Sequence, residues 1–152
     1  MVEAEIEFIE RFGLMFEEDG LPKIAGRIFA LLMLTDQALT LDEIAERLQV
    51  SKTSVSTNTR MLDSMRFVER TSRPGDRRAY YRLAPNGLEM SFERTRQRMG
   101  EVLELLETVS RDFPEKREVA LRRLKRMRDW HAFILDEMDE IWRRWQEKEG
   151  SS

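Results

Sequence analysis

The apolar positions between residues 40 and 65 recur at the spacing of two short helices joined by a tight turn. Thr40 and Glu43 have the spacing of a capping box, which predicts that a helix begins at Leu41. The apolar stripe of that helix consists of Leu41, Ile44, Ala45 and Leu48. One side of this first helix is therefore expected to be buried.

A second helix is predicted from Lys52 to Met65, after a turn at Gln49 and Val50. Ser51 has the position of its N-cap, where a hydroxyl accepts a hydrogen bond from a free backbone N–H. On the helical period, the inward side chains are Val55, Thr59 and Leu62, and the outward ones are Thr53, Ser56, Thr57 and Arg60. Short hydroxyls beside an amide and an Arg suit the base edges of a DNA major groove.

Two strand-like runs follow between residues 67 and 83, on either side of a turn at Pro74, Gly75 and Asp76. A hairpin directly after two such helices is typical of a winged helix-turn-helix. Together with the helical patterns on both sides, the sequence predicts a mainly α fold with a small β-hairpin wing.

Further helices are predicted on both sides of the winged helix-turn-helix. Residues 3–16 and 23–35 have helical apolar spacing before it. After the wing, a long helix is broken at residues 112–114, and Pro114 is expected in the first turn of a last helix that runs to about Lys148. We therefore expect an N-terminal dimerisation helix in residues 1–20, the winged helix-turn-helix in 21–84 and C-terminal dimerisation helices in 85–149.

The last helix carries a ladder of a and d positions whose spacing alternates between four and three residues. Such a seam needs a partner helix, and so much apolar helix would leave a large exposed patch on a monomer. We therefore expect a homodimer with long dimerisation helices, and the alternative is an intrachain coiled-coil hairpin. The expected interface residues are Ile6, Ile9, Leu124, Met127, Ile134, Met138, Ile141 and Trp145.

The residue order in the helix-turn-helix and the wing resembles the MarR-type transcriptional regulators. The segments that carry the resemblance are Leu41–Leu48, Ser51–Ser56 and Gly75–Arg78, together with Leu62. Residues 20–28 look more specifically like the GbsR-like branch of that superfamily. The resemblance implies a sequence-specific double-stranded DNA-binding regulator, expected to be a repressor that acts as a homodimer on a pseudo-palindromic operator.

The resemblance also implies a small-molecule effector that binds between the DNA-binding lobe and the dimerisation helices. The GbsR-like branch is associated with choline-type osmoprotectants, and an aromatic cage suits a quaternary ammonium group. Trp130, Trp142 and Trp145 are the candidates for such a cage, although packing on an amphipathic helix is the favoured interpretation. His131, the single histidine, is likewise favoured as a packing residue over a ligand or a pH sensor.

The candidates for DNA contact on the predicted recognition helix are Ser51, Lys52, Thr53, Ser54, Ser56, Thr57, Asn58 and Arg60. The helix N-terminus directs free N–H groups at a phosphate, and Lys52 adds a positive charge there. Arg60 on guanine and Asn58 on adenine would discriminate most, by about 1–3 kcal/mol each if bidentate. Asn58 lies near the inward edge of the helix, so packing or capping is an equal alternative for it.

In the wing, the resemblance implies roles for Arg73, Asp76, Arg77 and Arg78. Asp76, Arg77 and Arg78 match the wing-tip motif of the family, in which an Arg enters the minor groove and the Asp orients it. Such an insertion responds to the width and potential of the groove. The motif implies that Arg78 enters the groove, while Arg77 and Arg73 contact phosphates. The alternative is an ordinary Asp–Arg pair at a surface turn.

The distribution of charge agrees with DNA binding although the net charge is −3. Residues 51–82 contain 8 basic and 3 acidic side chains, a net charge of +5, so the rest of the chain carries −8. Residues 1–19 alone hold 7 acidic side chains and one Arg. One segment is therefore expected to attract a polyanion that the remaining surface repels.

The composition excludes several other functions. With no Cys, the chain has no disulfide, no thiolate chemistry and no Cys-ligated metal. With one His and no Gly-rich phosphate loop, we expect no enzyme, no cofactor and no metal site. The N-terminus is acidic, unlike a signal peptide, and the longest apolar run, residues 28–34, is too short to span a bilayer. We expect a cytoplasmic protein without membrane association, and the rival function is a winged helix that binds an acidic protein partner.

Overall fold

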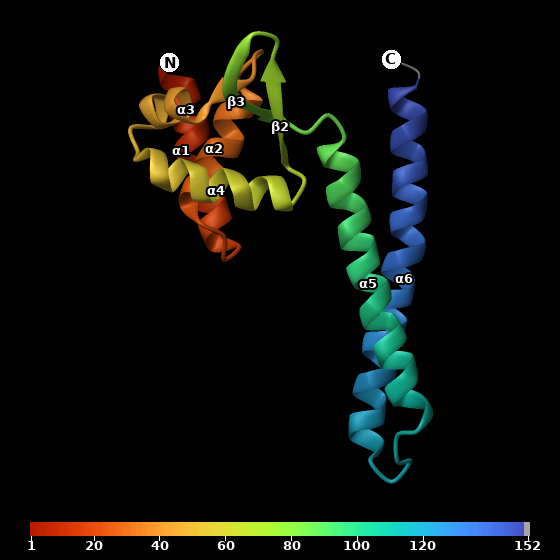
Figure 1. Ribbon diagram of the computed structural model, residues 1–152. Coiled ribbons are helices and arrows are strands. Elements are labelled where there is room, and N and C mark those ends of the chain that lie inside the picture. The colour runs from red at the N-terminus through yellow and green to blue at the C-terminus, as the bar shows by residue number, and fades with distance from the viewer. Residues whose placement is uncertain (151–152) are drawn as a thin grey trace. The chain divides into compact units, whose positions relative to one another are not determined.

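The computed structural model describes residues 1–150, which belong to two compact units (Figure 1). One unit spans Met1–Ser91, and the other begins at Phe92. The first unit contains α1 (Glu3–Glu18), α2 (Lys23–Met33), β1 (Leu39–Thr40), α3 (Leu41–Leu48), α4 (Lys52–Ser64), β2 (Val68–Arg73) and β3 (Asp76–Leu83). It also holds the first residues of α5 (Gly87–Arg111), whereas the rest of α5 and α6 (Glu118–Glu149) form the second unit. The predicted fold class, mainly helical with a small β wing, is confirmed.

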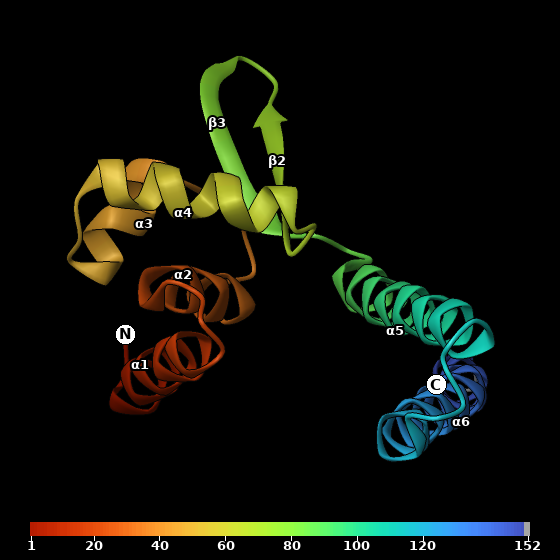
Figure 2. The same cartoon turned by 90° about the horizontal axis from the view of Figure 1, so that it is seen from below.

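The helix-turn-helix consists of α3 and α4 (Figure 2). Its caps are those that the sequence predicts. The Oγ1 of Thr40 accepts a hydrogen bond from the Glu43 N–H at 3.3 Å, and Oε2 of Glu43 accepts one from the Thr40 N–H at 2.7 Å. Gln49 ends α3 in the left-handed region, with a φ of 55°, which turns the chain toward α4. The Oγ of Ser51 then accepts a hydrogen bond from the Ser54 N–H at 3.2 Å and caps α4.

The inner face of α4 packs into the core of the first unit. Val55, Thr59 and Leu62 are each 0% exposed, as the helical period predicts. The other buried hydrophobic residues are Ala25, Ile28, Ala30, Leu31 and Leu32 of α2, Ile44 and Leu48 of α3, and Ile9, Leu39, Val68, Tyr80 and Tyr81. Because α2 supplies so many of them, it is the central packing element beneath the helix-turn-helix.

Three antiparallel strands form the sheet, in the order β1-β3-β2. β2 and β3 are the predicted hairpin, and Gly75 in its turn has a φ of +79°, a conformation that favours glycine. The sequence pattern does not reveal β1, because a strand of two residues is too short to show a period of two. β1 pairs Leu39 with Tyr81 and Thr40 with Tyr80, so Thr40 is both a strand residue and the N-cap of α3.

α1 packs along α2 at a contact between two glycines. A Cβ at Gly26 would lie 2.8 Å from the carbonyl O of Phe12 and 2.9 Å from the Cα of Gly13. The two helices therefore approach each other at a distance that leaves no space for a side chain. Aromatic rings also contact one another between these elements, and they belong to Phe8, Phe12 and Phe16 of α1, Phe29 of α2, and Phe67.

This packing changes the role expected for part of α1. Ile9, expected at a dimer interface, is 2% exposed and belongs to the hydrophobic core of its own unit. Its side chain is therefore covered within the chain and does not face a partner. Ile6, in contrast, is 48% exposed, and Leu14 and Met15 of α1 are exposed as well.

In the second unit, α5 and α6 run side by side in opposite directions (Figure 1). The Phe92 ring stacks on Trp142 with centroids 4.6 Å apart, and Nε of Arg96 donates to Oδ1 of Asp139 at 2.6 Å. Yet neither helix has a fully buried residue among those described, so the hairpin has no closed core of its own. No helix within residues 1–150 is apolar over a length sufficient to cross a membrane.

The break between these two helices differs from the prediction. α6 begins at Glu118, so Pro114 does not lie in its first turn. The chain instead forms a turn, in which the Arg117 N–H donates to the carbonyl O of Pro114 at 3.0 Å. The guanidinium of Arg117 also lies over the ring of Phe113. These local contacts hold the chain in a turn before the helix starts.

We expect Gly26→Ala to destabilise the first unit, because the added methyl group meets backbone atoms of α1. The cost expected for such overpacking is about 1–3 kcal/mol. Gly87→Ala is the control, since the nearest atoms to its Cβ would lie at 3.6 Å and 3.8 Å, which are ordinary contact distances. Urea unfolding measures both variants, and wild-type stability of Gly26→Ala would contradict the close crossing of α1 and α2.

Candidate nucleic-acid interface

The outer face of α4 is polar and open to solvent. Its exposed candidates are Ser51, Lys52, Thr53, Thr57 and Arg60, and its half-buried ones are Ser54 and Ser56. Because the opposite face is held in the core, this face cannot rotate away from solvent. It therefore presents hydroxyl groups and cations, the groups that bind phosphates and read base edges.

The two cations of this face have different surroundings. The Nζ of Lys52 pairs with a carboxylate oxygen of Asp42 at 2.8 Å and so links the start of α4 to α3. Both side chains are exposed, and an exposed ion pair contributes little to stability, so a phosphate can replace Asp42 as the partner of Lys52. The Nε of Arg60 contacts the carbonyl O of Ser56 at 3.4 Å, a long hydrogen bond, and Arg60 is exposed.

Asn58 does not belong to the outer face of α4. It is 8% exposed, and its Nδ2 donates to the carbonyl O of Ser54 at 2.9 Å within the same helix. A buried amide held in this way is turned away from a base edge. Of the two alternatives for Asn58, the burial and this hydrogen bond favour packing over a contact with adenine.

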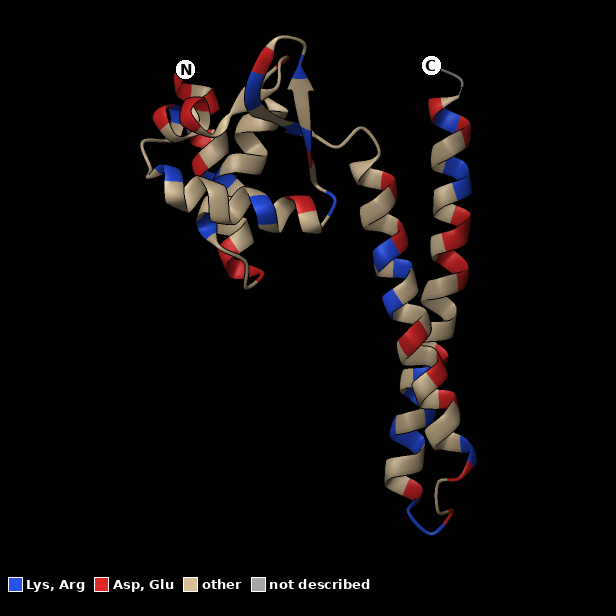
Figure 3. Ribbon diagram, in the orientation of Figure 1, with Lys and Arg blue, Asp and Glu red and all other residues tan. Residues whose placement is uncertain are grey.

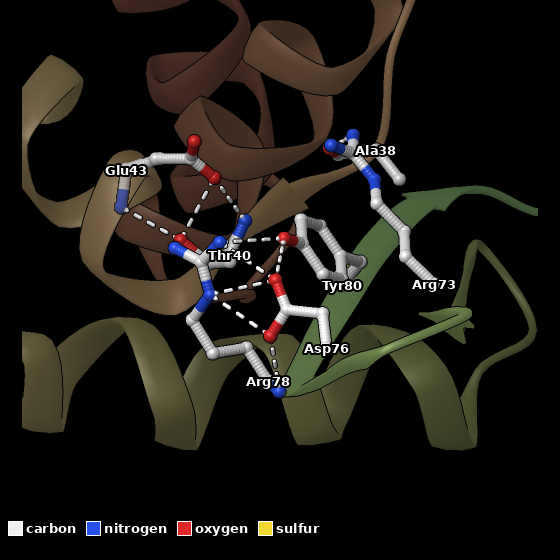
Figure 4. Close-up of polar contacts among 7 residues, drawn as sticks. All are labelled: Ala38, Thr40, Glu43, Arg73, Asp76, Arg78 and Tyr80. Atoms are coloured by element: carbon white, nitrogen blue, oxygen red, sulfur yellow. Dashed lines mark hydrogen bonds and ion pairs between the residues drawn. The ribbon is translucent and has the colours of Figure 1, made fainter.

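Asp76, Arg78 and Tyr80 form a hydrogen-bonded cluster on one face of β3 (Figure 4). The Nε of Arg78 donates to Oδ2 of Asp76 at 3.0 Å, and Nη2 donates to the same oxygen at 2.7 Å. The backbone N–H of Arg78 donates to Oδ1 of Asp76 at 2.9 Å. The Tyr80 hydroxyl donates to Oδ2 of Asp76 at 2.6 Å. Asp76 therefore orients Arg78, while the side chain of Arg78 stays 63% exposed.

These hydrogen bonds shift the protonation equilibria of the cluster. Donation by Arg78 and Tyr80 holds the pKa of Asp76 well below its ordinary value. The Asp76 carboxylate in turn raises the pKa of Arg78 and the pKa of Tyr80. At neutral pH, Asp76 is therefore an anion and the Tyr80 hydroxyl keeps the proton that it donates.

The other two arginines of the wing differ from each other. The Nη2 of Arg73 donates to the carbonyl O of Ala38 at 3.0 Å, and its guanidinium carbon lies 4.2 Å from the centroid of the Tyr80 ring. Arg73 thus fastens β2 to the segment before β1, and its expected contact with a phosphate stays a prediction. Arg77 is exposed and its side chain makes no hydrogen bond or ion pair within residues 1–150, so its guanidinium is open to a phosphate.

Positive charge follows α4 and the hairpin within the first unit. Figure 3 shows Lys and Arg along these elements, whereas Asp and Glu gather along α1. This separation matches the net charge of +5 that residues 51–82 carry. The surface formed by α4 and the wing therefore attracts a polyanion.

Tyr80 is a residue of this surface that the sequence pattern does not single out. Its side chain is 2% exposed, yet its hydroxyl completes the cluster around Asp76. The period of two along β3 places Asp76, Arg78 and Tyr80 on one face, which is the signal that could have revealed it. A tyrosine next to apolar neighbours is first interpreted as a core residue, and that interpretation hides the hydroxyl.

The residues expected at the dimer interface of α6 lie in two kinds of surroundings. Leu124, Ile134 and Met138 are half-buried, whereas Met127, Ile141 and Trp145 are 52%, 55% and 36% exposed. The predicted ladder thus spans a side of α6 that is partly covered and a side that is open. The open side also carries Val119, Trp130 and Phe133.

The tryptophans of α6 do not meet one another. Each has a different neighbour in the described structure: Trp142 has Phe92, Trp130 has Phe133, and Trp145 has Lys148. Within residues 1–150 no ring contact joins two tryptophans, which favours packing over an aromatic cage. The Nδ1 of His131 lies 2.8 Å from the carbonyl O of Met127 in the same helix, a contact that suits a packing residue.

The sequence matches two models of protein families and a regulator from a bacterium. Residues 19–79 match the MarR family, and residues 86–148 match the family described as MmpR5-like MarR family transcriptional regulator. The HTH-type transcriptional regulator MmpR5 of Mycobacterium tuberculosis (strain ATCC 25618 / H37Rv) is 32% identical over 146 residues, which cover 95% of this chain and 88% of that protein. These matches do not include the GbsR-like branch, which stays a prediction.

The fold is similar to that of a crystal structure described as a transcriptional regulator. The TM-score is 0.76 with 33% sequence identity, and the match covers 95% of this chain and 99% of that one. Both relatives are described as transcriptional regulators. They therefore favour a DNA-binding regulator over a winged helix that only binds a protein partner.

We expect the stability of the first unit to depend on pH through Asp76. Because folding lowers the pKa of Asp76, its contribution is complete above the ordinary aspartate pKa of about 3.9 and is lost as the pH falls toward the folded-state pKa. Asp76→Asn should therefore lower the unfolding temperature at pH 7 and have a smaller effect at pH 3. Asp42→Asn, which breaks an exposed pair with Lys52, is the control and should change little at either pH. Thermal unfolding followed by circular dichroism measures both, and a pH-independent effect of Asp76→Asn would contradict this role.

Proposed function

The chain belongs to the MarR family of DNA-binding transcriptional regulators, and we propose that it represses transcription as a homodimer on a pseudo-palindromic operator. The observation that carries the proposal is an exposed polar face on α4 beside a wing whose Asp76 orients Arg78. The first element suits a major groove, and the second suits the adjacent minor groove. Because such a regulator acts on the chromosome, we also propose the cytoplasm as its location.

In the proposed complex, α4 lies in the major groove with its outer face toward the bases. Thr53, Thr57 and Arg60 are the exposed candidates for base edges, and a bidentate Arg60–guanine pair would contribute about 1–3 kcal/mol of discrimination. The free backbone N–H groups in the first turn of α4 and the ammonium of Lys52 would together bind one phosphate. Ser54 and Ser56 are half-buried and stay candidates at the edge of this face.

The wing adds a contact of a different kind. We propose that Arg78 enters the minor groove while Asp76 holds its guanidinium plane, and that Arg77 binds a neighbouring phosphate. A narrow minor groove has an enhanced negative potential, so an inserted Arg is sensitive to groove width rather than to individual base edges. Arg73 supports the hairpin in this proposal, because Ala38 and the Tyr80 ring already hold its guanidinium.

The apolar surface of the second unit supports the homodimer. Several large apolar residues of α6 are exposed in the single chain, namely Val119, Met127, Trp130, Phe133, Ile141 and Trp145. On the helical period they fall on one side of α6, and an uncovered apolar side of this kind is typical of an interface. A second copy that covers it would relate two recognition helices by a twofold axis. Half-sites about 34 Å apart would follow from that symmetry.

A cavity in the first unit supports a small-molecule effector. Its volume is about 410 Å³, and its largely apolar lining includes Phe29, Met33, Phe67, Leu83, Pro85 and Leu88. This volume falls within the usual range of small-molecule sites. A ligand there would change DNA affinity only if it favoured one arrangement of the recognition helices over another. We propose that such a ligand relieves repression.

A gel shift on genomic fragments tests the proposed function directly. We expect selective retention of fragments that contain a palindrome, and we expect the affinity to fall as the salt concentration rises. Binding of every fragment with equal affinity would contradict recognition of an operator.

Two substitutions separate the roles of the wing and of α4. We expect Arg78→Ala to weaken binding to many sequences and to flatten the dependence of log affinity on log salt concentration by about 1. We expect Thr57→Ala to change the preference among operator variants instead, because it removes a group placed at base edges. Fluorescence anisotropy over a salt series measures both, and equal affinities of wild type and Arg78→Ala throughout would refute the role of the wing.

One substitution tests the proposed interface. Ile141→Glu places a charge on the open apolar side of α6, so we expect a shift from dimer to monomer at micromolar concentration. Asp136→Lys changes the charge on another side of the same helix and should leave the dimer intact. Sedimentation equilibrium measures both, and an Ile141→Glu protein that stays dimeric would place the interface elsewhere.

A further inference from the structure

We propose that Tyr80 is a positioning residue for DNA binding, whose hydroxyl and ring fix the orientation in which the wing presents Arg78. The inference rests on the proposed insertion of Arg78 into the minor groove. Tyr80 itself is 2% exposed, so it acts through Arg78 rather than by contact with DNA.

The hydroxyl of Tyr80 closes a triangle of hydrogen bonds (Figure 4). It donates to Oδ2 of Asp76 at 2.6 Å and accepts from Nη2 of Arg78 at 2.9 Å. The third side is the bond from Nη2 of Arg78 to Oδ2 of Asp76, at 2.7 Å. Each of the three groups is thus held by the other two. Within residues 1–150, Nη1 of Arg78 makes no hydrogen bond and stays free for DNA.

The position of the Tyr80 ring is fixed by its neighbours in the sheet and in the wing. In the middle of the sheet, Tyr80 pairs with Thr40 of β1 on one side and with Thr71 of β2 on the other. The ring also lies between two cations of the wing, because its centroid is 4.2 Å from the guanidinium carbon of Arg73 and 5.5 Å from that of Arg78. A cation at the face of an aromatic ring is attracted by its quadrupole. The hydroxyl therefore occupies a position that the sheet determines.

This anchoring matters because an exposed arginine on a hairpin loses side-chain freedom when it binds. Ordering such a side chain costs conformational entropy at the moment of association. A guanidinium already held by Asp76 and Tyr80 has lost part of that freedom in the free protein. Phenylalanine at position 80 would keep the ring and its packing but would remove one side of the triangle.

A double-mutant cycle between Tyr80→Phe and Arg78→Ala tests the proposal on the full-length protein. We expect Tyr80→Phe to weaken operator binding about three- to tenfold in the wild-type background, which is the usual effect of one lost hydrogen bond. In the Arg78→Ala background the same substitution should cost less than about twofold, because the residue through which it acts is gone. Tyr81→Phe is the matched control, since Tyr81 is the next residue of β3 and is 9% exposed. It should change the affinity less than about twofold in either background.

The outcomes separate this inference from the proposed function. Unchanged affinity of Tyr80→Phe, or an equal loss with and without Arg78, would overturn the positioning role. A wild-type protein that binds no duplex at low salt would instead refute the proposed function, and the inference with it, before any variant is made. The nuclear magnetic resonance signal of the Arg78 Nε–H in the free protein gives an independent readout. It should move in Tyr80→Phe and stay in Tyr81→Phe, and an unmoved signal in Tyr80→Phe would also overturn the proposal.

Discussion

Burial of the inner face of α4 is the constraint on which the rest of the proposed DNA-binding surface depends. Val55 and Leu62 are each 0% exposed, and burial of one large apolar side chain contributes about 1.5–3 kcal/mol. A rotation of α4 that exposed these residues would therefore cost several times the thermal energy. The outer residues face solvent because the core holds their neighbours. Their orientation exists before any nucleic acid arrives, which lowers the cost of ordering them on binding.

In the wing, too, a buried residue determines how the polar residues are oriented. The buried ring of Tyr80 lies in the central strand of the sheet, and its hydroxyl is hydrogen-bonded to the half-buried Asp76 and the exposed Arg78. Both of the elements proposed to bind DNA thus take their positions from one core. The exposed charges add attraction to this frame, whereas the half-buried Asp76 also contributes to its stability.

The elements with local signals were predictable from the sequence, and those that depend on distant neighbours were not. The caps at Thr40 and Ser51 and the turn at Gly75 are signalled within a few residues, so α3, α4 and the hairpin were predicted correctly. A helical stripe shows that one side is apolar but not what covers it, which is why Ile9 was assigned to a partner although its own core buries it. The sequence does not decide the role of Asn58 for the same reason, because this residue lies where the inner and outer faces meet.

Thr40 belongs to two elements at once, since it pairs with Tyr80 in the sheet and caps α3. The wing and the first helix of the helix-turn-helix are consequently linked through Thr40, so a tilt of one would move the other. Substitutions at the solvent-facing positions of α4 do not affect this link through Thr40. Side chains at those positions can therefore be exchanged one at a time, while the pairing that links the wing to α3 through Thr40 stays the same.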